Sequence, residues 1–145
     1  MNIKIREAYE SDNLEILSLI NNELGYPGVT LDELSLKINK IKSAGNYYIF
    51  VAISLDRIVG FAGVTKEMAL EIEKDFFRIR AMAVSEAHQS KGVGSSLLRH
   101  IEGIASEQGV ELFVLNSGFH RTEAHRFYER NGYIKTSFSF SKEIT

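Results

Sequence analysis

The fold is decided by a stretch in the second half of the chain, Met82-Ala83-Val84, then Ser85 to His88, then Gln89-Ser90-Lys91-Gly92-Val93-Gly94-Ser95. The apolar residues before position 85 predict a strand. A helix after the glycines is predicted by the apolar stripe Val93, Leu97, Ile101 and Ile104. The first amides of a helix lack internal partners and carry the positive end of its dipole. The loop between strand and helix is therefore predicted to bind an anion such as a pyrophosphate.

Two other phosphate-binding loops do not fit these residues. A Walker loop needs Lys-Ser or Lys-Thr directly after its last glycine, and neither follows Gly92 or Gly94. A dinucleotide-binding loop needs a third glycine at the position where Leu97 stands. A turn that uses glycine only to begin the helix stays open as the plainer interpretation.

Outward from this loop, the 145 residues suit a single domain, 1–145, without repeats or linkers. One helix is predicted after Ser11 or Asp12, with Leu14, Leu17, Ile20 and Leu24 on one face. A second is predicted after Thr30, which forms a capping-box pattern with Glu33. A further helix is predicted at 122–130, and the stretch 65–75 is left open between a loop and a strand. Strands are predicted at 3–6, 47–53, 57–64, 77–84, 111–115 and 133–142. This order predicts a mixed α/β sheet with a right-handed crossover through the helix at 93–108.

Composition narrows the classes of partner. The net charge of −2 gives no broad electrostatic reason to bind nucleic acid or an anionic membrane. No stretch approaches the ~18 apolar residues of a spanning helix, and the N-terminus does not resemble a signal peptide. The absence of cysteine excludes disulfides, thiolate metal ligands and cysteine nucleophiles, and it fits a cytoplasmic protein. The sequence leaves a homodimer open.

Two motifs resemble those of the GNAT (general-control-related N-acetyltransferase) superfamily. Gln89-x-x-Gly92-x-Gly94 is similar to the family's Gln/Arg-x-x-Gly-x-Gly/Ala motif and stands, as in the family, between the fourth strand and the third helix. The run from Ala124 to Tyr133 resembles the family's Ala-x-x-Phe-Tyr-x-x-x-Gly-Phe/Tyr segment. The resemblance implies a mostly antiparallel sheet with a parallel, splayed central strand pair flanked by helices. The tail 124–142 is similar to that of aminoalkylphosphonate N-acetyltransferases.

The resemblance implies an N-acetyltransferase that moves an acetyl group from acetyl-CoA to the primary amine of a small molecule, by direct attack on the thioester and without a metal. It implies that the pantetheine arm is held as an extra strand by the backbone of Met82, Ala83 and Val84. The pyrophosphate would be held by the amides of Gln89, Ser90, Lys91, Gly92, Val93, Gly94 and Ser95. An amide near Met82 would stabilise the oxyanion.

Tyr128 matches the family's general acid, which protonates the departing thiolate of CoA. A tyrosine with its reference pKa of ~10 stays protonated at neutral pH and is able to donate. Packing on the apolar face of a short helix is the alternative role. Asn116 and Arg121 lie near the positions where the family has CoA contacts, and Arg121 could equally be a solvated surface residue.

The general base is where the sequence departs from the family pattern. Many members carry a carboxylate on the fourth strand, but Phe77 to Ala81 contains no acid. Glu71, Glu73 and Glu23 are the candidates, acting through water, and the sequence does not choose among them. The departure also leaves open a catalytically silent, acyl-CoA-binding regulatory module.

Arg78 and Arg80 are two residues apart and therefore share one face of the predicted strand. They are candidates for clamping an acidic acceptor that bears a carboxylate or a phosphonate. Ion pairs with Glu71 and Glu73 on the sheet surface are the alternative. His120, His125 and Glu123 do not share one face of a short helix, so no metal site is predicted there.

Overall fold

A five-stranded sheet with the strand order β1-β2-β3-β4-β5 organises the computed structural model, which describes residues 2–145. The strands are β1 (Lys4–Glu7), β2 (Tyr47–Ser54), β3 (Arg57–Ala69), β4 (Ile72–Val84) and β5 (Phe113–Leu115). The first four strands pair antiparallel with their neighbours, and β4 and β5 run parallel. The chain divides into two units of dense internal contacts, one up to Val114 and one from Leu115 to Thr145.

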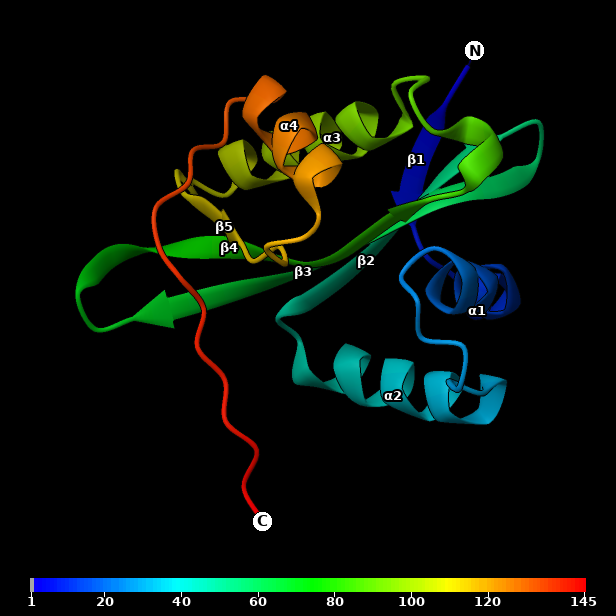
Figure 1. The fold of residues 1–145 in the computed structure, drawn as a ribbon, viewed down its shortest axis with the longest axis horizontal. Coiled ribbons are helices and arrows are strands. Elements are labelled where there is room, and N and C mark those ends of the chain that lie inside the picture. The colour runs from blue at the N-terminus through cyan, green and yellow to red at the C-terminus, as the bar shows by residue number, and fades with distance from the viewer. Residues whose placement is uncertain (1) are drawn as a thin grey trace. The chain divides into compact units, whose positions relative to one another are not determined.

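Three helices cover the sheet of the first unit (Figure 1). Helices α1 (Asn13–Asn22) and α2 (Leu31–Ala44) lie on one face, and α3 (Val93–Glu107) lies on the other. The side chains of each β-strand alternate between the faces, so each face has its own apolar core. On the α3 side, Phe50 and Phe77 pack against Leu97 and Ile101. On the α1 and α2 side, Val51, Phe61 and Ala83 pack against the two helices.

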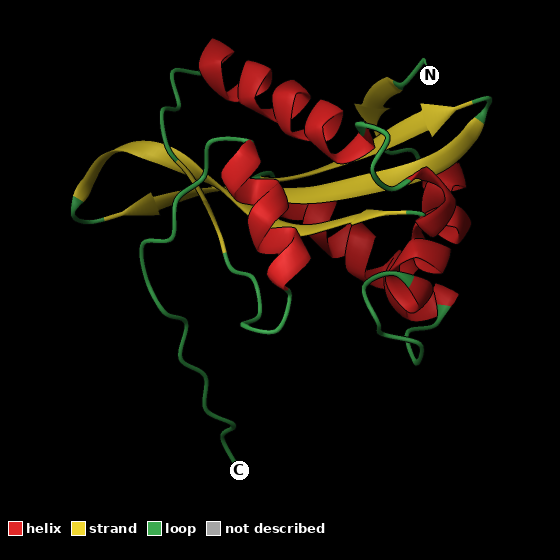
Figure 2. Cartoon of the chain, turned by 45° about the horizontal axis from the view of Figure 1, so that its top comes forward, coloured by secondary structure: helices red, strands yellow, loops and turns green. Residues whose placement is uncertain are grey.

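The β3–β4 hairpin is longer than the sequence pattern indicates (Figure 2). The stretch 65–75, which the sequence leaves open between loop and strand, continues β3 to Ala69 and begins β4 at Ile72. The register shifts by one residue between Gly63 and Val64, since Gly63 is opposite Ala81 and Val64 is opposite Ile79. Arg80 is the extra residue of this β-bulge, and a bulge redirects the side chains that follow it.

Of the two predicted N-terminal helix caps, the one at α2 is present and the one at α1 is not. The predicted capping box at α2 is confirmed: Glu33 N donates to Thr30 Oγ1 at 3.2 Å, and Thr30 N donates to Glu33 Oε2 at 3.4 Å. At α1, Asp12 is the residue before the helix, but its side chain makes no cap. The predicted apolar face of α1 is also shifted, because Leu14 is 65% exposed and Ile16 and Leu19 are buried.

The second unit contains α4 (Thr122–Arg130), whose bounds match the predicted helix at 122–130, and Gly132 beyond its end lies in the left-handed region at φ 92°. The predicted strand over Tyr133 to Lys142 is wrong, since the structure shows no strand in residues 133–145. Phe138 and Phe140 alternate with serine as in a strand, but a strand forms only where another edge offers hydrogen bonds. None of the helices described in residues 2–145 combines the length and apolar character needed to cross a bilayer.

Candidate active site

The loop after β4 ends at an open helix terminus. Ser90 and Gly92 both take left-handed backbone conformations, at φ 62° and 86°, and α3 begins at Val93. The first amide bonded within the helix is that of Ser96, which donates to Gly92 O at 3.0 Å. The N–H groups of Val93, Gly94 and Ser95 precede it and have no intrahelical acceptor. This arrangement is suited to binding a phosphate group.

Gln89 has a different role from the one that the motif alone indicates. Its backbone N–H donates to Glu86 O at 3.3 Å, so the open donors of the loop begin after Gln89. Its side-chain amide donates to Val84 O at 3.0 Å and to Glu23 Oε2 at 3.3 Å. The other oxygen of Glu23 accepts from Glu86 N at 3.1 Å. Gln89 and Glu23 together fasten the loop to the end of α1.

At the C-terminal end of β4, every second residue directs its peptide groups away from β3 and toward the side of β5. Ser85 N donates to Val59 O at 2.8 Å, and Ala83 is opposite Phe61 in the same register. In an antiparallel ladder every second residue bonds to the partner strand, so Ala83 bonds to β3 while Met82 and Val84 face away from it. The bond from Gln89 to Val84 O agrees with this direction. Of the three predicted backbone contacts, only Met82 and Val84 are therefore turned toward the side of β5.

The short β5 strand leaves much of that edge uncovered. β4 has 13 residues and β5 has three. Phe77 N donates to Leu112 O at 3.0 Å, which places the start of β5 beside the middle of β4. The peptide groups near Met82 and Val84 lie beyond the reach of three residues that begin there. This matches the splayed strand pair that the resemblance implies.

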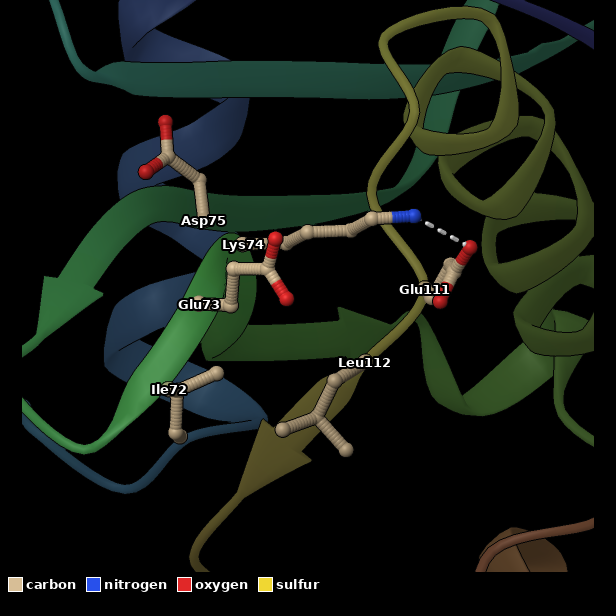
Figure 3. Close-up of a pocket in the computed structure, with 6 residues that line it drawn as sticks. All are labelled: Ile72, Glu73, Lys74, Asp75, Glu111 and Leu112. Carbon is tan, nitrogen blue, oxygen red and sulfur yellow. Dashed lines mark hydrogen bonds and ion pairs between the residues drawn. The ribbon is translucent and has the colours of Figure 1, made fainter.

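Two of the three candidate bases lie far from this end of β4. Glu71 is in the turn between β3 and β4, and Glu73 is the second residue of β4. Glu73 precedes Met82 by nine positions, which corresponds to roughly 30 Å along a strand. Glu73 lines a shallow pocket of about 230 Å³ together with Lys74 and Glu111, which form an ion pair at 2.6 Å (Figure 3). This distance excludes Glu71 and Glu73 as a base that acts near Met82.

The predicted pairing of Arg78 and Arg80 with Glu71 and Glu73 is also wrong. Both arginines approach Glu67 on β3, at 3.2 Å for Arg78 and 3.8 Å for Arg80. The reason is the hairpin register, in which Thr65 is opposite Arg78. The sequence analysis did not identify Glu67 as the partner of the two arginines. The only signal in the sequence was that Thr65 and Glu67 alternate along the stretch that pairs with the arginine strand.

The charges around Glu67 favour its ionised form. Burial alone would raise the pKa of this carboxyl, but hydrogen bonds from Thr65 and Arg78 and the charges of Arg78 and Arg80 together hold its pKa below the usual value. Thr65 Oγ1 donates to Glu67 Oε2 at 2.6 Å. Glu67 is therefore a counter-ion for the arginines and a weak proton acceptor near neutral pH.

Tyr128, Asn116 and Arg121 belong to the second unit. The Tyr128 ring lies on α4 between the rings of Phe127 and Tyr133, with centroid distances of 5.2 Å and 5.9 Å. Burial raises the pKa of the Tyr128 hydroxyl, and the charge of Arg121 opposes this shift. Tyr128 therefore keeps its proton throughout the neutral range. His125, in the same unit, contacts Gly118 O through Nε2 at 2.8 Å. Across residues 2–145 no three His, Asp or Glu side chains gather in a group able to hold a metal ion.

Comparisons with known proteins agree with this architecture. The profile of the Acetyltransferase (GNAT) domain family matches residues 45–135. Over 99 residues the chain is 29% identical to the aminoalkylphosphonate N-acetyltransferase of Salmonella typhimurium, a match that covers 68% of this chain and 64% of that protein. The chain thus spans less than two thirds of the length of that relative.

Solved structures show the same fold. A GNAT family acetyltransferase of Staphylococcus aureus has a TM-score of 0.79 and 26% identity, over 99% of this chain and 100% of that one. A protein of Bacillus halodurans described as a transcriptional regulator has a TM-score of 0.88 and 23% identity, over 99% of this chain and 100% of that one. The predicted GNAT fold is confirmed, and the chain belongs to the acetyltransferase (GNAT) domain family.

Proposed function

We propose that the chain transfers an acetyl group from acetyl-CoA to the primary amine of a small molecule. One observation carries this proposal: the outward peptide groups of Met82 and Val84 and the open first turn of α3 occur at the same end of β4. Only residues 85–92 separate the two. An elongated ligand with amide groups along one arm and phosphates at its end needs both kinds of donor. The relative from Salmonella, by its name, acts on an aminoalkylphosphonate, which supports a small amine as acceptor.

The residues of the loop and strand fit acetyl-CoA as follows. The peptide groups of Met82 and the N–H of Val84 would hold the pantetheine arm in the manner of an added strand. The amides of Val93, Gly94 and Ser95 would hold the diphosphate, with Ser90, Lys91 and Gly92 contributing from the loop. In the second unit, Asn116 and Arg121 would add contacts to the same ligand. Ala83 and Gln89 would support this site through the hydrogen bonds already described.

The proposed chemistry needs no covalent enzyme intermediate. The amine lone pair attacks the thioester carbon, and the Met82 N–H donates to the oxygen on which negative charge develops. The C–S bond then breaks and Tyr128 donates its proton to the departing sulfur, while the proton lost by the attacking nitrogen passes to solvent and the Tyr128 hydroxyl is restored from solvent. Glu23 accepts hydrogen bonds through both carboxylate oxygens, so we assign it a positioning role. Because residues 77–84 contain no acid, the amine that reacts is the fraction already deprotonated in solution.

Two measurements test this proposal. Titration calorimetry with CoA is expected to show saturable binding, and a thiol assay is expected to show release of free CoA when acetyl-CoA is mixed with suitable primary amines. The absence of saturable heat with CoA would overturn the proposal at its first step. Mass spectrometry of the product should show one added acetyl group on the amine.

A catalytically silent acyl-CoA-binding module is the second candidate. The observation that favours it is the absence of a carboxylate from Phe77 to Ala81. Such a module would bind acetyl-CoA in calorimetry and release no thiol with any amine. The retained Tyr128 has no function in that case beyond packing against Phe127 and Tyr133.

A further inference from the structure

Tyr47, the first residue of β2, extends its ring over Gly63 of β3. Side chains alternate along a strand, so Tyr47 points to the same side as Ile49 and Val51, which belong to the core under α1 and α2. A Cβ added at Gly63 would stand 3.1 Å from the Tyr47 hydroxyl oxygen and 3.2 Å from Cε1 of its ring. The hydroxyl therefore occupies the space that a side chain at position 63 would fill.

The strand register places this hydroxyl beside the reactive end of β4. Gly63 is opposite Ala81, and the next residue is Met82, whose N–H we assign to the developing oxyanion. Opposite residues of an antiparallel pair have Cα atoms about 4.5–5.5 Å apart. Ala81 adds only a methyl group, and it packs on the same side of the sheet as Tyr47. Tyr47, Ala81 and Met82 are all half-buried, so a small molecule is able to reach them.

The Tyr47 hydroxyl is neutral and has an unused acceptor. Burial raises the pKa of Tyr47, and the positive charge of Arg80 acts in the opposite direction. The hydroxyl thus keeps its proton through the neutral range. Within residues 2–145 it forms no hydrogen bond to another residue. A phenolic oxygen accepts one hydrogen bond while its own proton is donated to water.

An attacking amine needs such an acceptor. A neutral primary amine directs its lone pair at the thioester carbon, and an acceptor for one of its N–H groups fixes that direction. The neighbouring Arg78 and Arg80 are donors only, so their side chains are unable to accept an N–H. The carboxylate of Glu67 already accepts from Thr65 and Arg78. The Tyr47 oxygen is therefore the acceptor that this part of the sheet offers to an amine.

We propose that the Tyr47 hydroxyl oxygen accepts a hydrogen bond from the amine of the acceptor and aligns its lone pair with the thioester held at Met82. This inference rests on the proposed acetyltransferase function. Gly63 is a positioning residue, because the lack of a side chain there lets the hydroxyl reach this place. Tyr47 holds the amine and takes no proton from it.

Replacement by phenylalanine removes the hydroxyl and keeps the ring. Attack puts positive charge on the nitrogen, so the hydrogen bond to Tyr47 strengthens in the transition state and contributes to kcat as well as to amine binding. Tyr47→Phe is expected to lower kcat/KM for the amine roughly ten- to hundredfold in the thiol assay. The substrates are ethanolamine, β-alaninamide and aminomethylphosphonate, and the comparison uses whichever releases thiol fastest with wild type.

Two readouts separate this role from a structural one. The Kd for CoA and the Tm of Tyr47→Phe are expected to equal those of wild type, because the hydroxyl bonds to no residue of the protein. Tyr48→Phe is the matched control: its ring faces the other side of the sheet, stacked on Phe50 at 6.3 Å, and its turnover should be unchanged. Unchanged kcat/KM in Tyr47→Phe would contradict the inference, as would a loss that Tyr48→Phe shares.

A second variant displaces the hydroxyl without removing it. In Gly63→Ala the new methyl group pushes the end of the Tyr47 ring away, because 3.1 Å is too short for a carbon–oxygen contact of this kind. Gly63→Ala alone should lower kcat/KM for the amine at least about threefold. In the Tyr47→Phe background the same change should have little further effect, since the two residues act through one hydroxyl. Equal losses in the two backgrounds would show that Gly63 does not act through Tyr47.

A binding experiment separates this inference from the proposed function. The same three amines are titrated into CoA-saturated protein and followed by saturation-transfer NMR, with wild type and Tyr47→Phe. Binding that weakens at least about threefold in Tyr47→Phe supports the inference even if no thiol is ever released. Thiol release that is equal in both proteins would leave the transferase function standing and overturn the inference. Failure of all three amines to bind wild type would overturn it as well.

Discussion

The carboxylate of Glu23, at the end of α1, accepts a hydrogen bond from the side-chain amide of Gln89 at 3.3 Å, although 66 positions separate the two residues in the chain. The same carboxylate accepts from the backbone of Glu86 at 3.1 Å, and the amide of Gln89 also reaches Val84 O at 3.0 Å. The loop that leads to the open end of α3 is thereby tied to the first helix and to the last residue of β4. The position of the anion-binding amides thus depends on a contact remote in sequence.

Glu23→Ala is expected to weaken CoA binding through loss of this tie. Two hydrogen bonds to a charged acceptor disappear, and bonds of this kind are each worth about 1.5–3 kcal/mol when fully formed and less where solvent reaches them. We expect the Kd for CoA to rise by about tenfold in titration calorimetry, because part of the free energy of CoA binding is then used to order the loop. Glu107→Ala, at the exposed C-terminal end of α3, serves as the control and should leave the Kd unchanged. An unaltered Kd in Glu23→Ala would show that the loop holds its position without α1.

Gly92→Ala is expected to destabilise the protein and to weaken CoA binding. An added Cβ at Gly92 meets no atom within 4 Å, so the effect comes from the backbone, which is at φ 86°. A left-handed conformation costs a residue with a side chain about 1–2 kcal/mol. Thermal unfolding should show a lowered Tm. Gly103→Ala, within α3 and also without a neighbour inside 4 Å, should instead raise the Tm, because alanine is favoured over glycine in a helix by about 1 kcal/mol.

Tyr128→Phe is expected to lower kcat about 10²–10⁴-fold, the range typical of a lost general acid. The Kd for CoA should change little, because only the hydroxyl is removed. Tyr9→Phe, at a tyrosine that is 59% exposed on the other unit, is the matched control and should retain full turnover. Unchanged kcat in Tyr128→Phe would leave Tyr128 with a packing role beside Phe127 and Tyr133.

Turnover is expected to rise with pH through the neutral range. An alkylamine has a pKa of about 10.4, so the reactive fraction grows roughly tenfold for each pH unit below that value. Burial raises the pKa of Tyr128, so the acid stays protonated until the pH exceeds its ordinary value of about 10. The plot of log kcat/KM against pH should therefore have a slope near one from pH 6 to 9. A plateau that begins near pH 6 or 7 would reveal a base within the protein.

Asp12→Asn is expected to destabilise the fold by about 1.5–3 kcal/mol. Asp12 accepts from Arg6 Nη1 at 2.6 Å and from Tyr9 N at 2.7 Å, and its side chain is only 8% exposed. The hydrogen bond from Arg6 holds the pKa of Asp12 below its usual range in spite of burial. Because the folded pKa is lowered, this stabilisation is present above the ordinary value of about 3.9 and is lost as the pH falls through the folded pKa. Urea unfolding at pH 7 and pH 3 should therefore show a smaller acid effect in Asp12→Asn than in wild type, and Asp56→Asn in the β2–β3 turn should behave as wild type.

Features fixed by near neighbours in the chain could be predicted from the sequence. The strand, loop and helix from Met82 to Ser95 follow from a change in apolar period and from two glycines. The Thr30 capping box follows from a spacing of three residues. The left-handed backbone conformations of Gly45 and Gly132, which follow α2 and α4, are expected because glycine has no Cβ. In each case the interacting groups lie within one helical turn, so the local pattern contains the whole interaction.

The pairing of strands was decided only by the tertiary structure. A shift of one residue in register moves every side chain of a strand to the other face, and the bulge at Gly63 makes such a shift. The strand register brings Arg78 and Arg80 to Glu67, whereas the sequence alone suggested Glu71 and Glu73 as their ion-pair partners. The register also turns the peptide groups of Met82 and Val84, and not those of Ala83, toward the open edge of the sheet. Asp12 binds Arg6 and Glu23 binds Gln89 for the same reason: these partners lie on different elements, and only the packing of those elements brings them within hydrogen-bond distance.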